Sequence, residues 1–169
     1  MSIEIPPPYE AELRAWRRRS GDALAEHVTP HVTLVPPTPV PDDGLDRILG
    51  TLRERCAAVP PFEMKLRGTG TFRPVSDVVF IAVAEGISSC ELLADRLLVD
   101  ELRAPRSFPY PPHVTVAQDV DPEALDAAFE GLEGFRADLL VDHVWAHRQD
   151  GVGTWPPLAR FPLAGVALP

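Results

Sequence analysis

The chain has 169 residues, of which 45% are hydrophobic and 24% charged, so its size and composition are those of one soluble globular domain. Its 25 acidic residues outnumber 16 basic ones, and the formal net charge of -9 argues against a broad cationic surface for long nucleic acids. No apolar run reaches the roughly 20 residues of a membrane span, and the first residues lack the pattern of a signal peptide. We therefore expect a cytoplasmic protein without membrane contact.

The first half of the chain alternates predicted strands and helices. Apolar and β-branched runs predict strands over residues 2–5, 31–35, 62–67 and 78–84. Prolines 6 to 8 predict the start of a helix over residues 9–20. Apolar residues at helical spacing predict a second helix over residues 45–59, capped by Asp42 or Asp43.

The second half continues the alternation. Ser88 and Glu91 form a capping box that predicts a helix to about Leu102, and a loop follows over residues 103–112. A strand over residues 113–118, a helix over 121–132 and two closing strands complete the chain. In the closing strands, every second residue shares one face over residues 135–147 and again over 155–163. Short turns join several strands, so we expect an α+β protein with helices on mainly antiparallel sheet, in a single domain over residues 1–169.

Three groups of side chains are interpreted as structural. Both cysteines, Cys56 and Cys90, lack a CxxC motif or a neighbouring histidine cluster and are expected in the core. We expect core or lobe-interface positions for Trp16, Trp145 and Trp155. We interpret as a solvated helix face the basic residues Arg14, Arg17 and Arg18.

The most informative feature is an internal repeat. Pro30-His31-Val32-Thr33-Leu34 recurs as Pro112-His113-Val114-Thr115-Val116, 82 residues later. Because residues i and i+2 of a strand point the same way, each copy presents an imidazole and a hydroxyl on one face. If the two halves of the chain pack symmetrically, both pairs converge on one cleft.

Such a cleft suits phosphate-ester chemistry without metal. One neutral histidine takes a proton from the attacking oxygen, while the other, protonated, gives one to the leaving oxygen. The threonine hydroxyls hold the non-bridging oxygens. Either histidine could be the base.

The paired His-x-Thr-x motifs resemble those of the 2H phosphoesterase superfamily, the LigT-like or 2'-5' RNA ligase group. The contexts PHVTLVPP, FPYPPHVTVAQ, GTGTFRP and DVVFIAVAEG are also similar to that family, and the resemblance runs from about residue 1 to 163. It implies that His31 and His113 are the catalytic acid and base and that Thr33 and Thr115 bind phosphate. It also implies a bilobal, pseudo-two-fold fold with sheets lining a central cleft and helices outside.

By this resemblance, the expected function is a phosphodiesterase acting on 2',3'-cyclic or 2'-5' bonds of small nucleotides or RNA ends, with no metal or other cofactor. We also expect a monomer. Two alternatives stay open: RNA 2'-5' ligation in the same site, and a non-catalytic nucleotide-binding or RNA-binding module. Some members carry an arginine where this chain has Gln118, and this difference favours a small substrate over a long RNA.

Further residues near the motifs are weaker candidates. We predict substrate contacts for Phe72, Arg106 and Tyr110, with Arg73 beside them, although ordinary packing and solvation explain these residues as well. His27 begins a third His-x-Thr match but is interpreted as a turn residue. His143 and His147 lie four apart on a predicted strand, too far apart for a shared metal.

Overall fold

The computed structural model describes residues 1–99, 102, 111–150 and 154–166. One antiparallel sheet dominates these residues, and its eight strands follow the order β6-β3-β4-β5-β2-β1-β7-β8. The strands are β1 (Ser2–Glu4), β2 (His31–Thr33), β3 (Phe62–Thr71), β4 (Val78–Glu85), β5 (His113–Gln118), β6 (Arg136–Val141), β7 (His143–His147) and β8 (Pro157–Pro162). The described helices are α1 (Tyr9–Arg19), α2 (Leu45–Ala57), α3 (Ile87–Leu97) and α4 (Pro122–Gly131), with a 3-10 turn η1 (Asp42–Gly44).

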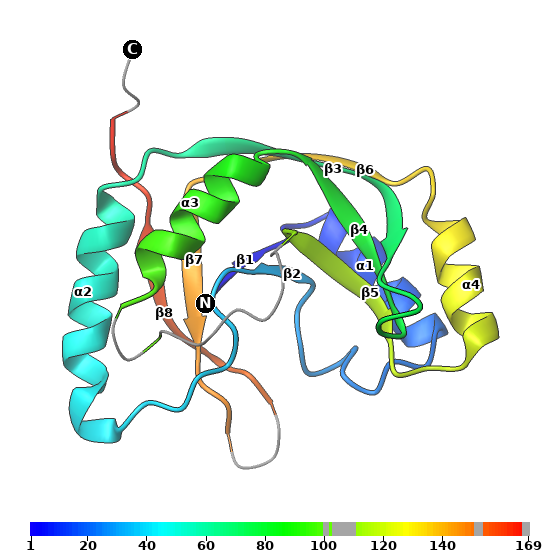
Figure 1. Ribbon diagram of the computed structural model, residues 1–169, viewed down its shortest axis with the longest axis horizontal. Helices are drawn as coiled ribbons and strands as arrows, with labels where there is room; N and C mark the ends of the chain where they lie inside the picture. The colour runs from blue at the N-terminus through cyan, green and yellow to red at the C-terminus, as the bar shows by residue number, and fades with distance from the viewer. Residues whose placement is uncertain (100–101, 103–110, 151–153, 167–169) are drawn as a thin grey trace.

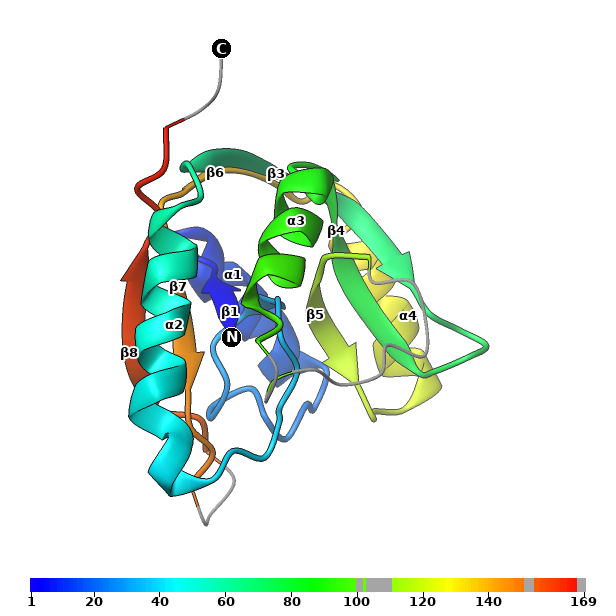
Figure 2. The same cartoon turned by 60° about the vertical axis from the view of Figure 1, so that its left-hand side comes forward.

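The sheet has an approximate two-fold arrangement about its centre. The strands β5 and β2, which carry the two motifs, are neighbours there, and three more strands extend on either side. Figure 1 shows α2 beside β7 and β8 at one end of the curled sheet and α4 beside β3 to β5 at the other. Figure 2 shows the same arrangement from a second direction. The expected α+β class, with helices on antiparallel sheet, is therefore confirmed.

The core lies between the sheet and the helices that cover it. Val32 and Val114, the middle residues of the two motifs, have no exposed surface, as strand alternation requires when the histidines face the other way. Cys56 and Cys90 are also fully buried and unpaired, which confirms their expected core positions. Burial raises the pKa of the Cys56 thiol to about 11 and that of Cys90 to about 12.

The predicted boundaries of two helices are wrong for local reasons. The helix expected from Ser88 begins at Ile87, directly after Gly86, whose φ of 90° is left-handed and whose close approach to the Glu63 carbonyl leaves no room for a Cβ. This helix ends at Leu97. The aspartates expected to cap the second helix instead form the turn η1, and Gly44 occupies the N-cap position of α2.

The long strand expected over residues 135–147 is divided at Asp142. Ala137, Leu139 and Val141 are buried in β6, but Val144 and Ala146 are the buried residues of β7, so the alternation changes phase. Strand β6 pairs with β3, whereas β7 pairs with β1 and β8 on the other side of the sheet. One continuous stretch of chain thus joins the two ends of the sheet.

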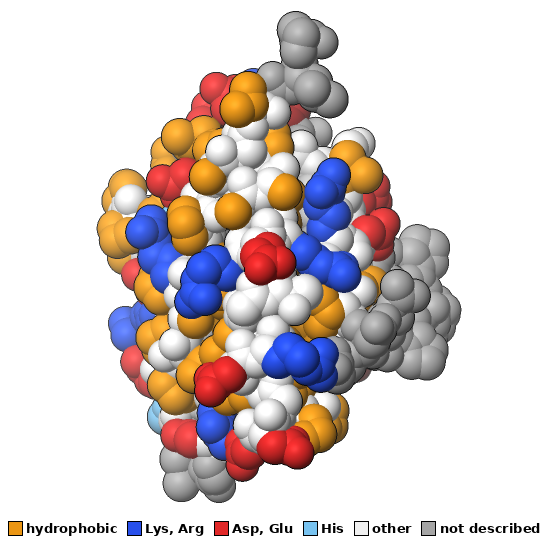
Figure 3. Space-filling model, turned by 90° about the vertical axis from the view of Figure 1, so that its left-hand side faces the viewer, with side chains coloured by type: hydrophobic (Ala, Val, Ile, Leu, Met, Phe, Trp, Pro, Cys, Tyr) orange, Lys and Arg blue, Asp and Glu red, His pale blue; other side chains and the backbone are white. Residues whose placement is uncertain are grey.

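The outer surface on the side of α2 and β8 carries both positive and negative charges. Figure 3 shows basic, acidic and hydrophobic side chains interspersed on this face. Among the described residues, no helix combines the length and apolarity needed to cross a membrane.

Candidate active site

The two motifs meet directly in the sheet. Strands β2 and β5 are antiparallel, with Val32 paired to Val114. This register sets His31 opposite Thr115 and Thr33 opposite His113, about 5 Å apart across the strands and on the same face. The predicted convergence of two imidazoles and two hydroxyls follows from this single strand pair.

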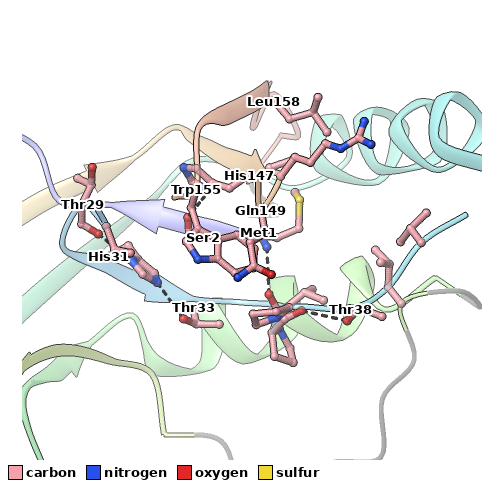
Figure 4. Close-up of a pocket in the computed structure, with 18 of the residues that line it drawn as sticks. Met1, Ser2, Thr29, His31, Thr33, Thr38, His147, Gln149, Trp155 and Leu158 are labelled. Atoms are coloured by element: carbon pink, nitrogen blue, oxygen red, sulfur yellow. Dashed lines mark hydrogen bonds between the residues drawn. The ribbon is translucent and has the colours of Figure 1, made fainter. Parts of the chain in front are cut away.

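All four motif side chains line one cavity of about 870 Å³. Its volume is within the range of small-molecule sites, roughly 300 to 1,000 Å³. Figure 4 shows His31 and Thr33 on one side of this cavity, with side chains from β1, β7 and the segment before β8 nearby.

Backbone carbonyls fix the tautomer of both histidines. His31 Nδ1 lies 2.7 Å from the Thr29 carbonyl oxygen, and His113 Nδ1 lies 2.8 Å from that of Pro111. Because a carbonyl oxygen only accepts, each Nδ1 carries the proton and donates it. In the neutral rings Nε2 is then the acceptor, and the Thr33 hydroxyl donates to His31 Nε2 over 3.1 Å (Figure 4). Each Nε2 is thus the atom available for proton transfer.

Burial favours the neutral form of both rings. Desolvation lowers the pKa of His31 below 6.5, and nearby positive charge from His147 and Arg17 lowers it further, against the opposing bond to Thr29. Desolvation also lowers the pKa of His113, opposed by its bond to Pro111. Two bases are therefore available near neutral pH, and they differ in their electrostatic surroundings.

The weaker candidates have different positions. Phe72 packs edge-on against the His113 ring at 5.0 Å and lies 4.5 Å from Phe80, so it supports the imidazole from outside the set of cavity residues. Arg73 forms an ion pair with Asp126 at 2.7 Å. Arg106 and Tyr110 lie outside the described residues. Substrate contact by Phe72, Arg106 and Tyr110 remains a prediction.

Several cavity residues were not predicted. Glu4 and His147 form an ion pair with a 2.9 Å contact between Oε1 and Nε2, and the Ser2 hydroxyl lies 3.3 Å from His147 Nδ1. Trp155, expected in the core or at a lobe interface, lines the cavity instead. Strand pairing brings these residues together from opposite ends of the chain, and no local pattern in the sequence signals it.

The interpretation of Arg17 as a solvated residue is wrong. Its guanidinium is buried, 2.8 Å from the Asp22 carboxylate and 2.6 Å from the Val28 carbonyl oxygen. It also lines the cavity. The turn after α1 folds back over the helix and covers the face that carries Arg17. The sequence of the helix alone predicts that this face is exposed.

The alternative histidines do not join the motif pair. His27 is exposed in a turn, as expected. His143 contacts Asp142, while His147 contacts Glu4, so these two rings have separate partners. Within the described part of the chain, no group of three or more histidine, cysteine or acidic side chains has the spacing of a metal site.

Known proteins are similar to this chain in sequence and in fold. Residues 5–153 match the family model of the 2'-5' RNA ligase superfamily. A Staphylococcus epidermidis (strain ATCC 12228) protein named "Putative phosphoesterase" is 27% identical over 135 residues, which cover 80% of this chain and 76% of that protein. A protein of the same name from Staphylococcus aureus (strain Newman) is 24% identical over 159 residues, 92% of this chain and 93% of its own.

Solved structures share the fold over nearly the whole chain. TT0787 of Thermus thermophilus has a TM-score of 0.64 at 24% identity, covering 97% of this chain and 96% of its own. E. coli LigT complexed with NADP+ has a TM-score of 0.65 at 22% identity, covering 96% of this chain and 95% of its own. These likenesses confirm the predicted 2H phosphoesterase fold.

Proposed function

Since the chain belongs to the 2'-5' RNA ligase superfamily, we propose that it is a phosphodiesterase acting on 2',3'-cyclic or 2'-5' phosphodiesters of small nucleotides or RNA ends. The observation that carries the proposal is the β2–β5 pair, which puts two His-x-Thr motifs side by side in one cavity. Phosphodiester hydrolysis needs a base, an acid and hydrogen-bond donors for the phosphate oxygens, and this strand pair offers all three.

In the proposed reaction, the neutral imidazole accepts a proton from water at Nε2 while the water oxygen bonds to phosphorus. The bond from phosphorus to the leaving oxygen breaks, and Nε2 of the protonated imidazole gives its proton to that oxygen. The two rings exchange protonation states and return to the starting states by exchange with solvent. With substrate bound, the Thr33 hydroxyl turns from His31 Nε2 to donate to a non-bridging oxygen, which frees Nε2 to accept a proton. Thr115 donates to the non-bridging oxygens as well, where negative charge increases.

We assign the base to His31 and the acid to His113. The support is electrostatic, because the charges of His147 and Arg17 help to lower the pKa of His31, whereas burial alone lowers that of His113. A lower pKa favours the neutral ring that accepts a proton from water.

A small nucleotide is the proposed substrate class. Structures of E. coli LigT are complexed with NADP+, 3'-AMP and ATP, so a protein of this fold binds nucleotides. The net charge of -9 weakens attraction for a long RNA strand. Both observations favour one nucleotide, or the end of an RNA, over a duplex.

The test is turnover of the four 2',3'-cyclic mononucleotides by purified protein in excess EDTA. We expect conversion of the cyclic phosphate to a monoester, with the rate unchanged by the chelator. Loss of activity in EDTA that added divalent metal restores would contradict the metal-independent scheme. No turnover of cyclic or 2'-5' linked substrates would leave a binding module as the better account.

Ligation is the second candidate, because the description of the matching family includes RNA ligase. Ring opening is reversible in principle, so a 5'-hydroxyl can replace water as the attacking group. An RNA pair carrying a 2',3'-cyclic end and a 5'-hydroxyl end distinguishes the reactions. A joined product resistant to 3'-5' specific nucleases would demonstrate the 2'-5' linkage.

A further inference from the structure

The approximate two-fold arrangement of the sheet gives each motif histidine an equivalent neighbouring strand. Strand β1 borders β2 on one side of the centre, and β4 borders β5 on the other. Glu4 is opposite His31, as Ala82 is opposite His113. Side chains opposite each other in antiparallel strands share a face of the sheet. The first motif therefore has a carboxylate beside it where the second has a methyl group.

The next strand outward adds a second difference. Strand β7 borders β1, as β3 borders β4. His147 is two residues beyond the β7 partner of Ser2, which is itself opposite the first motif threonine. Phe72 is two residues beyond the β3 partner of Phe80, which is itself opposite the second motif threonine. Phe72 packs edge-on against the second motif imidazole, with ring centroids 5.0 Å apart, and His147 occupies the equivalent place beside the first.

His147 has an acceptor at each ring nitrogen. Its Nε2 lies 2.9 Å from a carboxylate oxygen of Glu4, and its Nδ1 lies 3.3 Å from the Ser2 hydroxyl. The imidazole and the carboxylate are only 16% and 28% exposed, so the pair is largely shielded from solvent. A protonated imidazole donates at both nitrogens, and these two oxygens match both donors. The arrangement therefore suits a cation that stands beside the first motif and has no nitrogen left for substrate.

The charge of this ring reaches His31. Burial is the main cause of the lowered pKa of His31, and among the nearby charges His147 contributes most, ahead of Arg17 and the chain's amino group. Burial is also what lowers the pKa of His113. The described charged groups that border this part of the cavity are Glu4, Arg17 with its partner Asp22, Arg148 with its partner Asp42, and the amino group of Met1.

We propose that His147 is a positioning residue for the reaction, and that its positive charge, fixed by Glu4 and Ser2, selects His31 as the base. The aromatic ring of Phe72, in the equivalent place, brings no charge to His113, so the second imidazole keeps its proton for the leaving oxygen. This inference rests on the proposed phosphodiesterase function and identifies what makes two equivalent motifs unequal.

The experiment follows the two motif imidazoles by NMR over a range of pH in the protein without substrate. The pH profile of kcat/KM for a 2',3'-cyclic nucleotide is measured in parallel. His147→Gln keeps a donor for Glu4 but removes the positive charge. We expect the pKa of His31 to rise by at least about 0.5, and by more than that of His113. The acid limb of the profile, which reports the base, should move to higher pH by the same amount.

Two control variants separate the charge of the ring from its place in the structure. His147→Lys keeps a cation beside Glu4, so it should retain a pKa of His31 close to that of wild type. His143→Gln removes a histidine from the same face of β7 that also contacts a carboxylate, that of Asp142. Because His143 lies outside the described cavity lining, this substitution should change neither the titration nor the profile.

Ser2→Ala keeps the proposal testable if His147→Gln does not fold. It removes the acceptor at Nδ1, which makes the protonated ring less stable, so the pKa of His31 should rise by a smaller amount. An unchanged pKa of His31 in a folded His147→Gln protein, or an equal rise in His147→Lys or His143→Gln, would overturn the proposal. Absence of turnover by wild type would instead count against the proposed function, and the titration would still decide whether His147 sets the protonation of His31.

Discussion

The imidazoles of His31 and His113 occupy equivalent places in a repeated motif but have different neighbours. His31 has Arg17 and His147 near it, whereas His113 packs against the rings of Phe72 and Phe80. Equivalent backbone geometry thus presents two rings in different electrostatic surroundings. An acid-base pair uses such a difference, because one ring must be neutral while the other is charged.

If His113 is the acid, a substrate with a good leaving group should restore the activity of His113→Ala. A nucleoside 4-nitrophenyl phosphodiester releases a phenolate that needs no proton. On this substrate His113→Ala should retain activity within about tenfold of wild type, while His31→Ala should remain at least about 100-fold slower. Release of nitrophenolate is followed by absorbance. Rescue of His31→Ala instead would reverse the two roles.

The pH dependence follows from the same surroundings. In the enzyme without substrate, the pKa values of His31 and His113 are lowered from 6.5, chiefly by burial. The active form has one neutral and one protonated ring, so its population is greatest between the two pKa values, on the acid side of pH 6.5. We predict a bell-shaped profile of kcat/KM with its maximum below pH 6.5, measured in buffers of constant ionic strength.

Binding of substrate should shift the pH of maximal activity. A bound phosphodiester anion favours the protonated rings, so the optimum of kcat should lie at a higher pH than that of kcat/KM. A profile that is flat from pH 5 to 9 would contradict the two-histidine scheme.

At the scale of elements, the turn between α1 and β2 holds the first motif in place. Arg17 joins this turn to the helix by contacts to Asp22 and the Val28 carbonyl, and both charged side chains are almost completely buried. Asp22→Ala leaves a buried guanidinium without its counter-ion. We predict a loss of about 3 kcal/mol in the free energy of unfolding, measured with urea.

The neighbouring pair of Arg18 and Glu26 is the matched control. It joins the same helix to the same turn but is exposed to solvent. Glu26→Ala should leave the unfolding midpoint unchanged, because exposed pairs contribute little. Equal effects of Asp22→Ala and Glu26→Ala would show that the buried pair does not stabilise this turn.

The alternation within each motif was the most informative local signal in the sequence. The alternation of His31 and Thr33, and of His113 and Thr115, predicted which side chains share a face, and the observed strands agree. The division at Asp142 was not predicted, because the sequence of residues 135–147 is compatible with one alternating strand. The change of phase is seen only in the burial of Val144 and Ala146. What decides the break is that β6 and β7 pair with different partners.

The unpredicted part of the site has the same physical origin. Glu4 and His147 are 143 residues apart and meet through the pairing of β1 with β7. Trp155 and residues of α2 line the same cavity because α2 packs against β8, the strand that Trp155 precedes. Periodicity identifies faces of single elements, whereas such contacts depend on the order of strands in the sheet.

At the scale of the whole molecule, the continuous sheet joins the two halves through β5 and β2. We propose that residues 1–169 form one domain of two packed lobes and predict a single cooperative unfolding transition. Tryptophan fluorescence and far-ultraviolet circular dichroism should give coincident urea curves. Separate transitions would show that the halves unfold independently.

The central claim is that His31 and His113 act together on one phosphodiester. Its most direct test is the single-turnover rate of a 2',3'-cyclic nucleotide with wild type, His31→Ala, His113→Ala and the double variant, each checked by circular dichroism. We predict a fall of at least about 100-fold in each single variant and little further loss in the double variant, because the two residues work as a unit. A folded single variant within about tenfold of the wild-type rate would contradict the claim.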